Sequence, residues 1–155
     1  MAQAGILAGF DQAVIYSVSD SASQLIAGAG LNGAVNITVT DTASVAQATL
    51  VAEAGATGTK SVAALSDSAT ALAGSSDAVL DLVTGAVTAT TAATVSEAAT
   101  LAGFDKAVIY SVSDSANQLV AGAGLDGAVD ITVTGTASVD EVQIALGAGN
   151  SGITT

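Results

Sequence analysis

A long internal repeat constrains the fold of this chain more than any other feature. Residues 7–45 and 101–139 align without a gap at an offset of 94, and only six of the 39 aligned positions differ. Several differences are conservative, such as Asn for Asp and Ile for Val. Repeated sequence predicts repeated structure, so we expect stacked supersecondary units that bury a shared core.

A shorter unit lies inside the long repeat. Six segments closely follow the pattern apolar-x-apolar-x-(Asp/Gly/Thr)-(Ser/Thr)-Ala, and the fifth position of the pattern recurs at spacings of 21, 26, 24, 23 and 21 residues. Alternation of apolar and hydroxyl residues predicts a short strand in each segment. A period of about 23 residues is typical of solenoid coils with one strand and one helix. The expected strands lie near 16–20, 37–41, 63–67, 87–91, 110–114 and 131–135.

Five of the six predicted strands lead toward the signature of a helix start. A Ser or Thr followed three residues later by Gln or Glu, which is the capping-box pattern, occurs five times in register with the repeat. Regular glycines then predict the helix ends. Strands connected through helices are expected to be parallel, with right-handed crossovers. The chain is therefore predicted to be α/β: residues 1–155 form a single repeat domain, a βα-repeat solenoid whose single parallel sheet of about six short strands carries short helices on one face.

Composition excludes several classes of function. Fourteen acidic residues against Lys60 and Lys106 give a net charge of -12, which disfavours binding to nucleic acid and to anionic membranes. The chain has no Cys and no His, which excludes disulfides, thiol chemistry and the commonest transition-metal ligand. No apolar stretch approaches the roughly 18 uninterrupted residues of a membrane-spanning helix, so membrane insertion is not expected.

No motif in the sequence predicts an enzyme or a bound cofactor. The pattern G-x-G-x-x-G occurs at Gly28 and again at Gly122, but it follows a predicted helix, whereas the dinucleotide-binding motif follows a strand. The many serines lack a histidine or a suitably placed lysine that would activate a nucleophile. Tyr16 and Tyr110 are predicted to be core residues.

The predicted strands place hydroxyl groups on the face away from the helices. This outward face holds no charge and no aromatic group. Its T-x-T ladder resembles that of ice-binding solenoids, which implies ice or mineral as a candidate ligand of the hydroxyl groups. The expected hydroxyl ladder consists of Ser17, Ser19, Thr38, Thr40, Ser66, Thr88, Thr90, Ser111, Ser113, Thr132 and Thr134.

Acidic residues recur at the predicted turn from strand to helix. Asp20, Asp41, Asp67 and Asp114 occupy one repeat position, where carboxylates typically cap a helix and interact with its dipole. A carboxylate ladder that binds calcium is the alternative, although Thr91 and Gly135 interrupt it. The glycine-rich returns add two further calcium candidates, and the complete set is Asp20, Asp41, Asp67, Asp114, Asp126 and Asp130.

The DSA and DTA turns, the YSVS and ITVT strands and the regular glycine returns resemble the acidic, Ala/Val/Thr/Ser-rich tandem repeats of large exported bacterial surface proteins, including adhesins, surface-layer-like and hemolysin-type proteins. The resemblance implies an extracellular or cell-surface location and a role in surface structure or adhesion.

Both edges of the predicted sheet are open, and open edges pair with other strands. We therefore expect a non-enzymatic structural module without a cofactor, whose partner is a second copy or a neighbouring repeat in a fibre, coat or stalk. Two readings of the chain remain open: an excerpt from a longer array, or a subunit that polymerises end to end. The alternatives in function are an ice- or mineral-binding hydroxyl ladder and a calcium-stabilised exported repeat.

Overall fold

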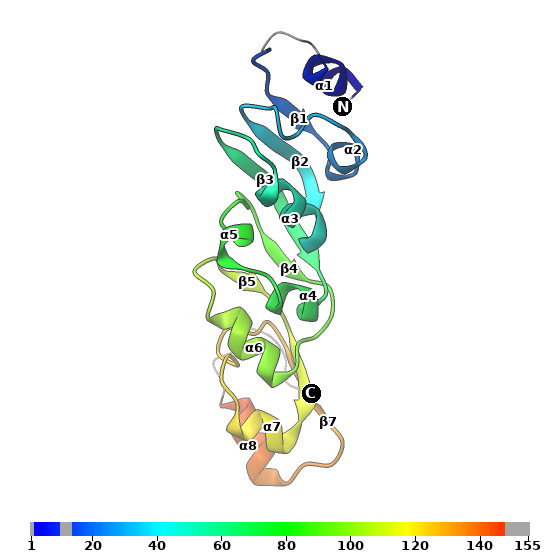
Figure 1. The fold of residues 1–155 in the computed structure, drawn as a ribbon. Helices are drawn as coiled ribbons and strands as arrows, with labels where there is room; N and C mark the ends of the chain where they lie inside the picture. The colour runs from blue at the N-terminus through cyan, green and yellow to red at the C-terminus, as the bar shows by residue number, and fades with distance from the viewer. Residues whose placement is uncertain (1, 10–13, 148–155) are drawn as a thin grey trace. The chain divides into compact units, whose positions relative to one another are not determined.

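In a computed structural model, residues 2–9 and 14–147 are described. These residues alternate between short strands and short helices along the chain (Figure 1). The chain divides into two compact units, one formed by residues 1–66 and 76–86 and the other by residues 67–75 and 87–155. Each unit is described by itself below.

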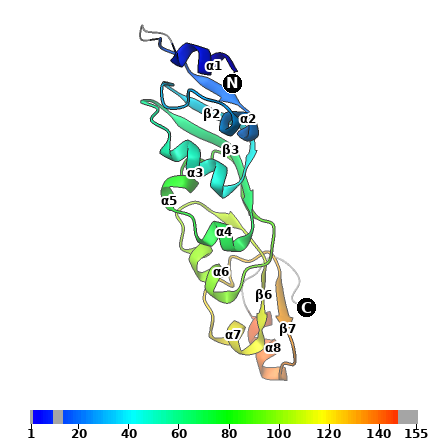
Figure 2. The same ribbon diagram turned by 45° about the vertical axis from the view of Figure 1, so that its right-hand side comes forward.

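Unit 1 contains three strands and four helices among its described residues. These elements are α1 (Ala2–Ala8), β1 (Val18–Asp20), α2 (Ala22–Ala27), β2 (Ile37–Ala43), α3 (Val45–Glu53), β3 (Lys60–Asp67) and α5 (Asp77–Leu80), of which Asp67 itself belongs to unit 2. Strand β2 pairs in parallel with β1 and with β3. Helices α2 and α3 pack beside each other against β2 (Figures 1 and 2).

Unit 2 contains four strands and four helices among its described residues. These elements are α4 (Ala69–Ala73), β4 (Val87–Ala89), α6 (Val95–Ala102), β5 (Val108–Ile109), β6 (Val112–Ser115), α7 (Ala116–Ala121), β7 (Ile131–Thr134) and α8 (Val139–Leu146). Strand β4 pairs in parallel with β5, and β6 pairs in parallel with β7. Helix α6 packs beside α4 and against β6, and α7 packs beside α8.

The strands belong to two sheets. Strands β1 to β5 follow one another in a five-stranded sheet, and β6 and β7 form a two-stranded sheet. The predicted combination of parallel strands and short helices is confirmed. The prediction of a single sheet of about six strands is wrong, because the strand expected near 110–114 is divided into β5, which begins two residues earlier, and β6.

A register change in unit 2 explains the division of the sheet. Thr88 pairs with Ile109, and the next bridge joins Ala93 to Val112. Four residues separate Thr88 from Ala93, whereas two separate Ile109 from Val112. The two additional residues cannot join the ladder, so regular pairing stops and resumes at the bridge.

Register also differs from the sequence alignment in β3. The pattern aligned Ala63 with Ile37, but β3 begins at Lys60, which pairs with Ile37, and Val62 pairs with Val39. The register then shifts by one residue between Val39 and Thr42. Val62 is consequently buried, and Ala63 is only half-buried.

Helix starts follow the predicted capping pattern at most positions. Complete capping boxes begin α3 at Ser44 and α6 at Thr94. Ser138 and Glu141 exchange the same two hydrogen bonds at α8, and Ser21 accepts from the Gln24 backbone N–H at α2. Ser115, which also belongs to β6, makes no side-chain cap at α7.

The core is built from small and aliphatic side chains. Strand residues such as Ile37, Val39 and Ile131 and helix residues such as Leu25 and Leu119 are almost completely buried. No polar or charged residue is buried among the described residues. The abundance of Ala on the packed faces allows helix and strand backbones to approach closely, which compensates for the scarcity of aromatic residues.

Candidate functional site

The acidic residues at the strand-to-helix turn accept hydrogen bonds from backbone N–H groups. Asp20, Asp67 and Asp114 each accept with Oδ1 from the N–H of the following serine, at 2.9, 2.8 and 2.8 Å. These bonds fix the turn that leads into the next helix. This is the turn-forming role that the residue type and position predict.

Residues at the same repeat position also accept a hydrogen bond from the first residue of the helix in the preceding coil. Asp41 Oδ1 accepts from the Ala22 N–H at the first residue of α2, at 2.7 Å. Asp114 Oδ2 accepts in the same way from Val95, the first residue of α6, at 3.1 Å. Each side chain therefore joins its own strand to the helix of the coil before it, and we call this contact the joint.

Thr91 forms the same joint with a hydroxyl group. Its Oγ1 accepts from the Ala69 N–H at the first residue of α4, at 3.0 Å. The residue that interrupts the aspartate ladder in sequence therefore preserves its hydrogen bond. Gly135 has no side chain to offer at this position, and Ser115 makes no side-chain cap to α7 either.

Carboxylates that serve backbone N–H groups are poorly arranged for calcium, which takes six to eight oxygen ligands. No three His, Cys, Asp or Glu side chains in the described part of the chain converge in a group that could hold a metal ion. Asp126 and Asp130 lie exposed in the return between α7 and β7. The four calcium candidates in the turns, Asp20, Asp41, Asp67 and Asp114, lie in four different coils, so their carboxylates do not form one group of ligands.

Two tyrosines anchor the glycine-rich returns. Tyr16 donates from its hydroxyl to the Gly30 carbonyl, and Tyr110 donates equivalently to Gly124, both at 2.6 Å. Tyr110 is buried, as predicted for a core residue, whereas Tyr16 is half-buried. Burial raises the pKa of Tyr110, and the negative charge of Asp126 adds to that increase.

Gly30 and Gly124 have φ values of +99° and +82°, which favour glycine. A Cβ at Gly30 would lie 2.7 Å from the Ala4 carbonyl oxygen, and one at Gly124 would lie 2.5 Å from that of Ala98. Both returns therefore pass directly against the backbone of the helix in the preceding coil, which is α1 for Gly30 and α6 for Gly124.

Asparagines in unit 1 connect successive returns, which the sequence did not indicate. Asn36 donates from Nδ2 to Ser17 Oγ at 3.1 Å and accepts from the Thr59 N–H at 2.8 Å. Asn32 accepts from the Gly55 N–H at 2.9 Å. No repeated pattern signalled this role, because both asparagines lie in one return and the second copy has Asp126 and Asp130 at these positions.

The expected hydroxyl ladder is distributed over shorter rows. In unit 1, Ser19 is aligned with Thr38, and Thr38 with Ser61, a residue absent from the expected ladder. In unit 2, Thr88 is opposite Ile109. Six of the predicted residues are exposed and five half-buried; the exposed ones are Ser17, Ser19, Thr40, Thr90, Thr132 and Thr134, and the half-buried ones are Thr38, Ser66, Thr88, Ser111 and Ser113.

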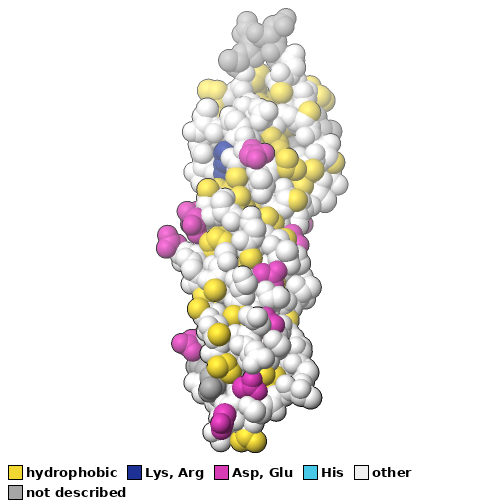
Figure 3. Space-filling model, turned by 60° about the horizontal axis from the view of Figure 1, so that its bottom comes forward, with side chains coloured by type: hydrophobic (Ala, Val, Ile, Leu, Met, Phe, Trp, Pro, Cys, Tyr) yellow, Lys and Arg dark blue, Asp and Glu magenta, His cyan; other side chains and the backbone are white. Residues whose placement is uncertain are grey.

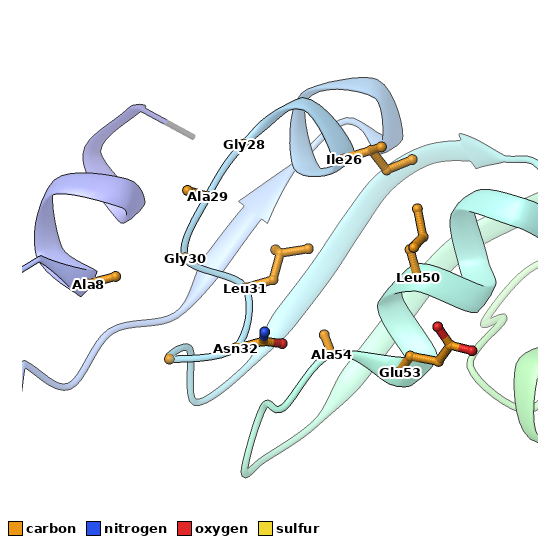
Figure 4. A pocket seen from close by; sticks show the side chains of 11 residues that line it. Ala8, Ile26, Gly28, Ala29, Gly30, Leu31, Asn32, Leu50, Glu53 and Ala54 are labelled. Carbon is orange, nitrogen blue, oxygen red and sulfur yellow. The ribbon is translucent and has the colours of Figure 1, made fainter.

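An open groove of about 580 Å³ lies on unit 1 beside α2 and α3 (Figure 4). Its lining includes Ile26, Leu31 and Leu50, and Figure 4 shows Glu53 at the end of α3 nearby. Asn32 is the other polar side chain in the lining, and its Oδ1 is bonded to Gly55. The groove thus offers an apolar surface and no set of groups for general acid–base chemistry.

Acidic side chains occupy several separate places on the face drawn in Figure 3. This dispersion matches the single acidic residues spread along the sequence. Within the described ranges, no helix is both long enough and apolar enough to cross a membrane.

Comparisons with protein-family models, with curated proteins and with solved structures find no match to this chain.

Proposed function

We propose that the chain is a segment of a βα-repeat solenoid and serves as a non-enzymatic structural module of an extracellular bacterial surface protein. It associates with further coils of the same kind in a fibre, coat or adhesin stalk. The joint carries this proposal. Parallel strand pairing and a cap from the next coil recur at Asp41, Thr91 and Asp114, so each coil presents a surface that another coil of the same type complements.

The coil formed by β7 and α8 supports the proposal through its exposure. Val95 at the start of α6 is 7% exposed where Asp114 joins it, whereas Val139 at the start of α8 is 74% exposed. Ala93 before α6 is buried, and Ala137 before α8 is exposed. The coil that follows α6 covers the corresponding positions there, so Ala137 and Val139 form an exposed apolar surface on the β7–α8 coil.

The charge distribution fits a self-associating module that must stay soluble. A net charge of -12, spread over single acidic residues, opposes non-specific aggregation. The resemblance to acidic tandem repeats of exported bacterial proteins is the support for a location at the cell surface.

Sedimentation velocity over a concentration series tests the association, with negative-stain electron microscopy of the largest species. We expect larger species as concentration rises, and Val139→Glu should abolish them by placing a charge on the exposed apolar surface of the β7–α8 coil. The matched control is Ile109→Glu, which changes a side chain that is 47% exposed and lies away from the joint. A parent chain that remains monomeric at every concentration, or an equal effect of both substitutions, refutes the proposal.

Hydroxyl rows favour ice or mineral binding as a second candidate function. Thr38 and Ser61 on adjacent strands have their hydroxyl oxygens 3.5 Å apart, and Ser19 on β1 is aligned with Thr38, so three hydroxyl residues form a row across the sheet of unit 1. Thermal hysteresis in the parent chain, lost in the double substitution Thr38→Leu with Thr40→Leu, would support it. The absence of hysteresis in the parent chain refutes it.

A further inference from the structure

An exposed turn in the return between α2 and β2 contains an asparagine followed by a glycine. Asn32 and Gly33 are the central residues of this turn, which the Ala34 N–H closes on the Leu31 carbonyl at 3.2 Å. Both central residues are exposed. The closing bond uses the N–H of Ala34, so the N–H of Gly33 lies outside it. The turn thus presents a backbone nitrogen directly after an asparagine amide.

Asparagine is a chemically labile residue, and glycine after it gives the least hindrance to ring closure. The glycine nitrogen attacks Cγ of the asparagine, and the new N–Cγ bond replaces the Cγ–Nδ2 bond. The proton of the glycine N–H leaves in the ammonia that is released. Water then opens the succinimide ring, at Cγ to give isoaspartate's normal isomer, aspartate, with the original chain, or at the backbone carbonyl to give isoaspartate. Each conversion exchanges one ammonia for one water and adds one negative charge.

The hydrogen bond of the Asn32 side chain favours this attack. Its Oδ1 accepts from the Gly55 N–H at 2.9 Å, and Figure 4 shows the side chain beside Ala54, which precedes Gly55. Negative charge develops on Oδ1 when the ring closes. A backbone donor at hydrogen-bond distance stabilises such charge, as the donors of an oxyanion hole do. The bond that connects two returns therefore also activates Cγ of Asn32.

The fold requires glycine at the position that makes the asparagine labile. A Cβ at Gly33 would lie 2.8 Å from the Tyr16 hydroxyl, which donates to the Gly30 carbonyl. A larger residue would therefore disturb the bond that anchors the return. Gly127 has the same relation to Tyr110 in the second copy, at 2.9 Å.

The second copy carries aspartate, one product of the reaction, at the equivalent position. Asp126 and Gly127 are the central residues of its turn, which the Ala128 N–H closes on the Leu125 carbonyl at 3.1 Å. The turn therefore has the same closing bond with aspartate as with asparagine. A carboxylate also keeps an oxygen that accepts hydrogen bonds, so conversion to aspartate is compatible with the fold.

We propose that Asn32 is a site of spontaneous covalent modification in the folded chain, where it converts through a succinimide to aspartate and isoaspartate. Aspartate preserves the turn and the acceptor for Gly55. Isoaspartate adds one carbon to the backbone of a tight turn, so it breaks the bond between Ala34 and Leu31 and moves the carboxylate away from Gly55. Only the isoaspartyl form separates the two returns of unit 1. This inference goes beyond the structural role proposed above and does not depend on it.

Peptide mapping of the folded full chain tests the site. The chain is incubated in mildly alkaline buffer and digested at intervals with trypsin, whose cleavage after Lys60 releases residues 1–60. Mass spectrometry detects the exchange of ammonia for water, and fragmentation assigns it to one residue and distinguishes the two products. We expect both products at Asn32 and none at this position in Asn32→Gln, because glutamine has to close a larger ring. A digest made before incubation measures conversion during digestion itself.

Asn36 is the internal control in the same peptide. It is followed by the β-branched Ile37, whose N–H donates to the Thr59 carbonyl at 3.0 Å. Conversion at Asn32 should be at least about tenfold faster than at Asn36, because the glycine nitrogen is unhindered and the isoleucine nitrogen is crowded and bonded. Equal conversion of the two asparagines would overturn the inference. So would an Asn32 that stays intact in the folded chain but converts in urea.

Hydrogen exchange at the Gly55 amide tests the structural consequence. Ion exchange separates converted from unconverted chains, because conversion adds one negative charge. The Gly55 amide should exchange faster in the isoaspartyl chains than in unconverted chains, whereas Asn32→Asp should leave its exchange close to that of the parent. Unchanged exchange in the isoaspartyl chains, or an equal increase in Asn32→Asp, would refute the separation of the returns by isoaspartate.

Discussion

Asp114 offers the sharpest test of the joint, because one side chain serves two backbone groups. Its Oδ1 accepts from Ser115 at 2.8 Å and its Oδ2 from Val95 at 3.1 Å. Asp114→Ala removes both bonds and the negative charge at the start of α6. Loss of a capping side chain costs about 0.5–2 kcal/mol, and bonds to a charged acceptor lie at the upper end of that range. Because Asp114 is half-buried, we expect local opening at the start of α6 to become about 2 kcal/mol easier.

Native-state hydrogen exchange at the Val95 amide measures this effect directly. A change of about 2 kcal/mol corresponds to exchange roughly 30-fold faster. Thr91→Val removes a single neutral hydroxyl from the Ala69 N–H, so exchange at Ala69 should accelerate about 5-fold, as expected for about 1 kcal/mol. Asp105→Ala, a change of an exposed aspartate outside the joints, is the control. An unchanged Val95 amide in Asp114→Ala, or an equal change in the control, would refute the capping role.

Three further outcomes follow from the geometry. Gly124→Ala should lower the urea midpoint far more than Gly135→Ala: both glycines have φ near +80°, which costs an alanine about 1–2 kcal/mol, but a Cβ meets the Ala98 backbone at Gly124 and nothing within 4 Å at Gly135. Thr70→Val should raise the pKa of Glu97, measured by carboxyl-carbon NMR, because the Thr70 hydroxyl bond is the largest cause of its lowered pKa; the stabilisation from this lowered pKa is present above the unfolded-state pKa and is lost as pH falls. The melting temperature should be the same in calcium and in chelator, because the turn carboxylates bond to backbone N–H groups; a calcium-dependent increase would favour the calcium-stabilised alternative.

Local pattern was sufficient to predict the kinds of element and their order. Alternation around Ile37 and Val39 gave a buried strand, and the Ser44–Gln47 and Thr94–Glu97 pairs gave capping boxes. These features depend on residues that are only a few positions apart in the chain, so the sequence is sufficient to predict them. The parallel direction of the strands followed from the helical connections.

The strand register and the hydrogen-bond partners of the turn residues depend on residues far away in the chain, so local pattern could not predict them. Nothing near Lys60 indicates that β3 begins there, because the bulge that realigns it lies in β2. The bond between Asp41 and Ala22 spans 19 residues, and the equivalent bond between Thr91 and Ala69 spans 22. Because the returns differ in length, the same contact does not recur at a fixed sequence spacing. The sequence position of each aspartate indicated its own turn and gave no sign of the helix it also caps.

The joint gives the array a direction. The joint bond comes from the coil that follows, so the first residue of a helix depends on its C-terminal neighbour in addition to its own N-cap, as α2 depends on Asp41 and α6 on Asp114. Loss of order in one coil would release the helix start of the coil before it and leave the helix start of the coil after it bonded. Unfolding in such a chain spreads toward the N-terminus. A substitution that destabilises one coil therefore also destabilises the helix start of the coil N-terminal to it.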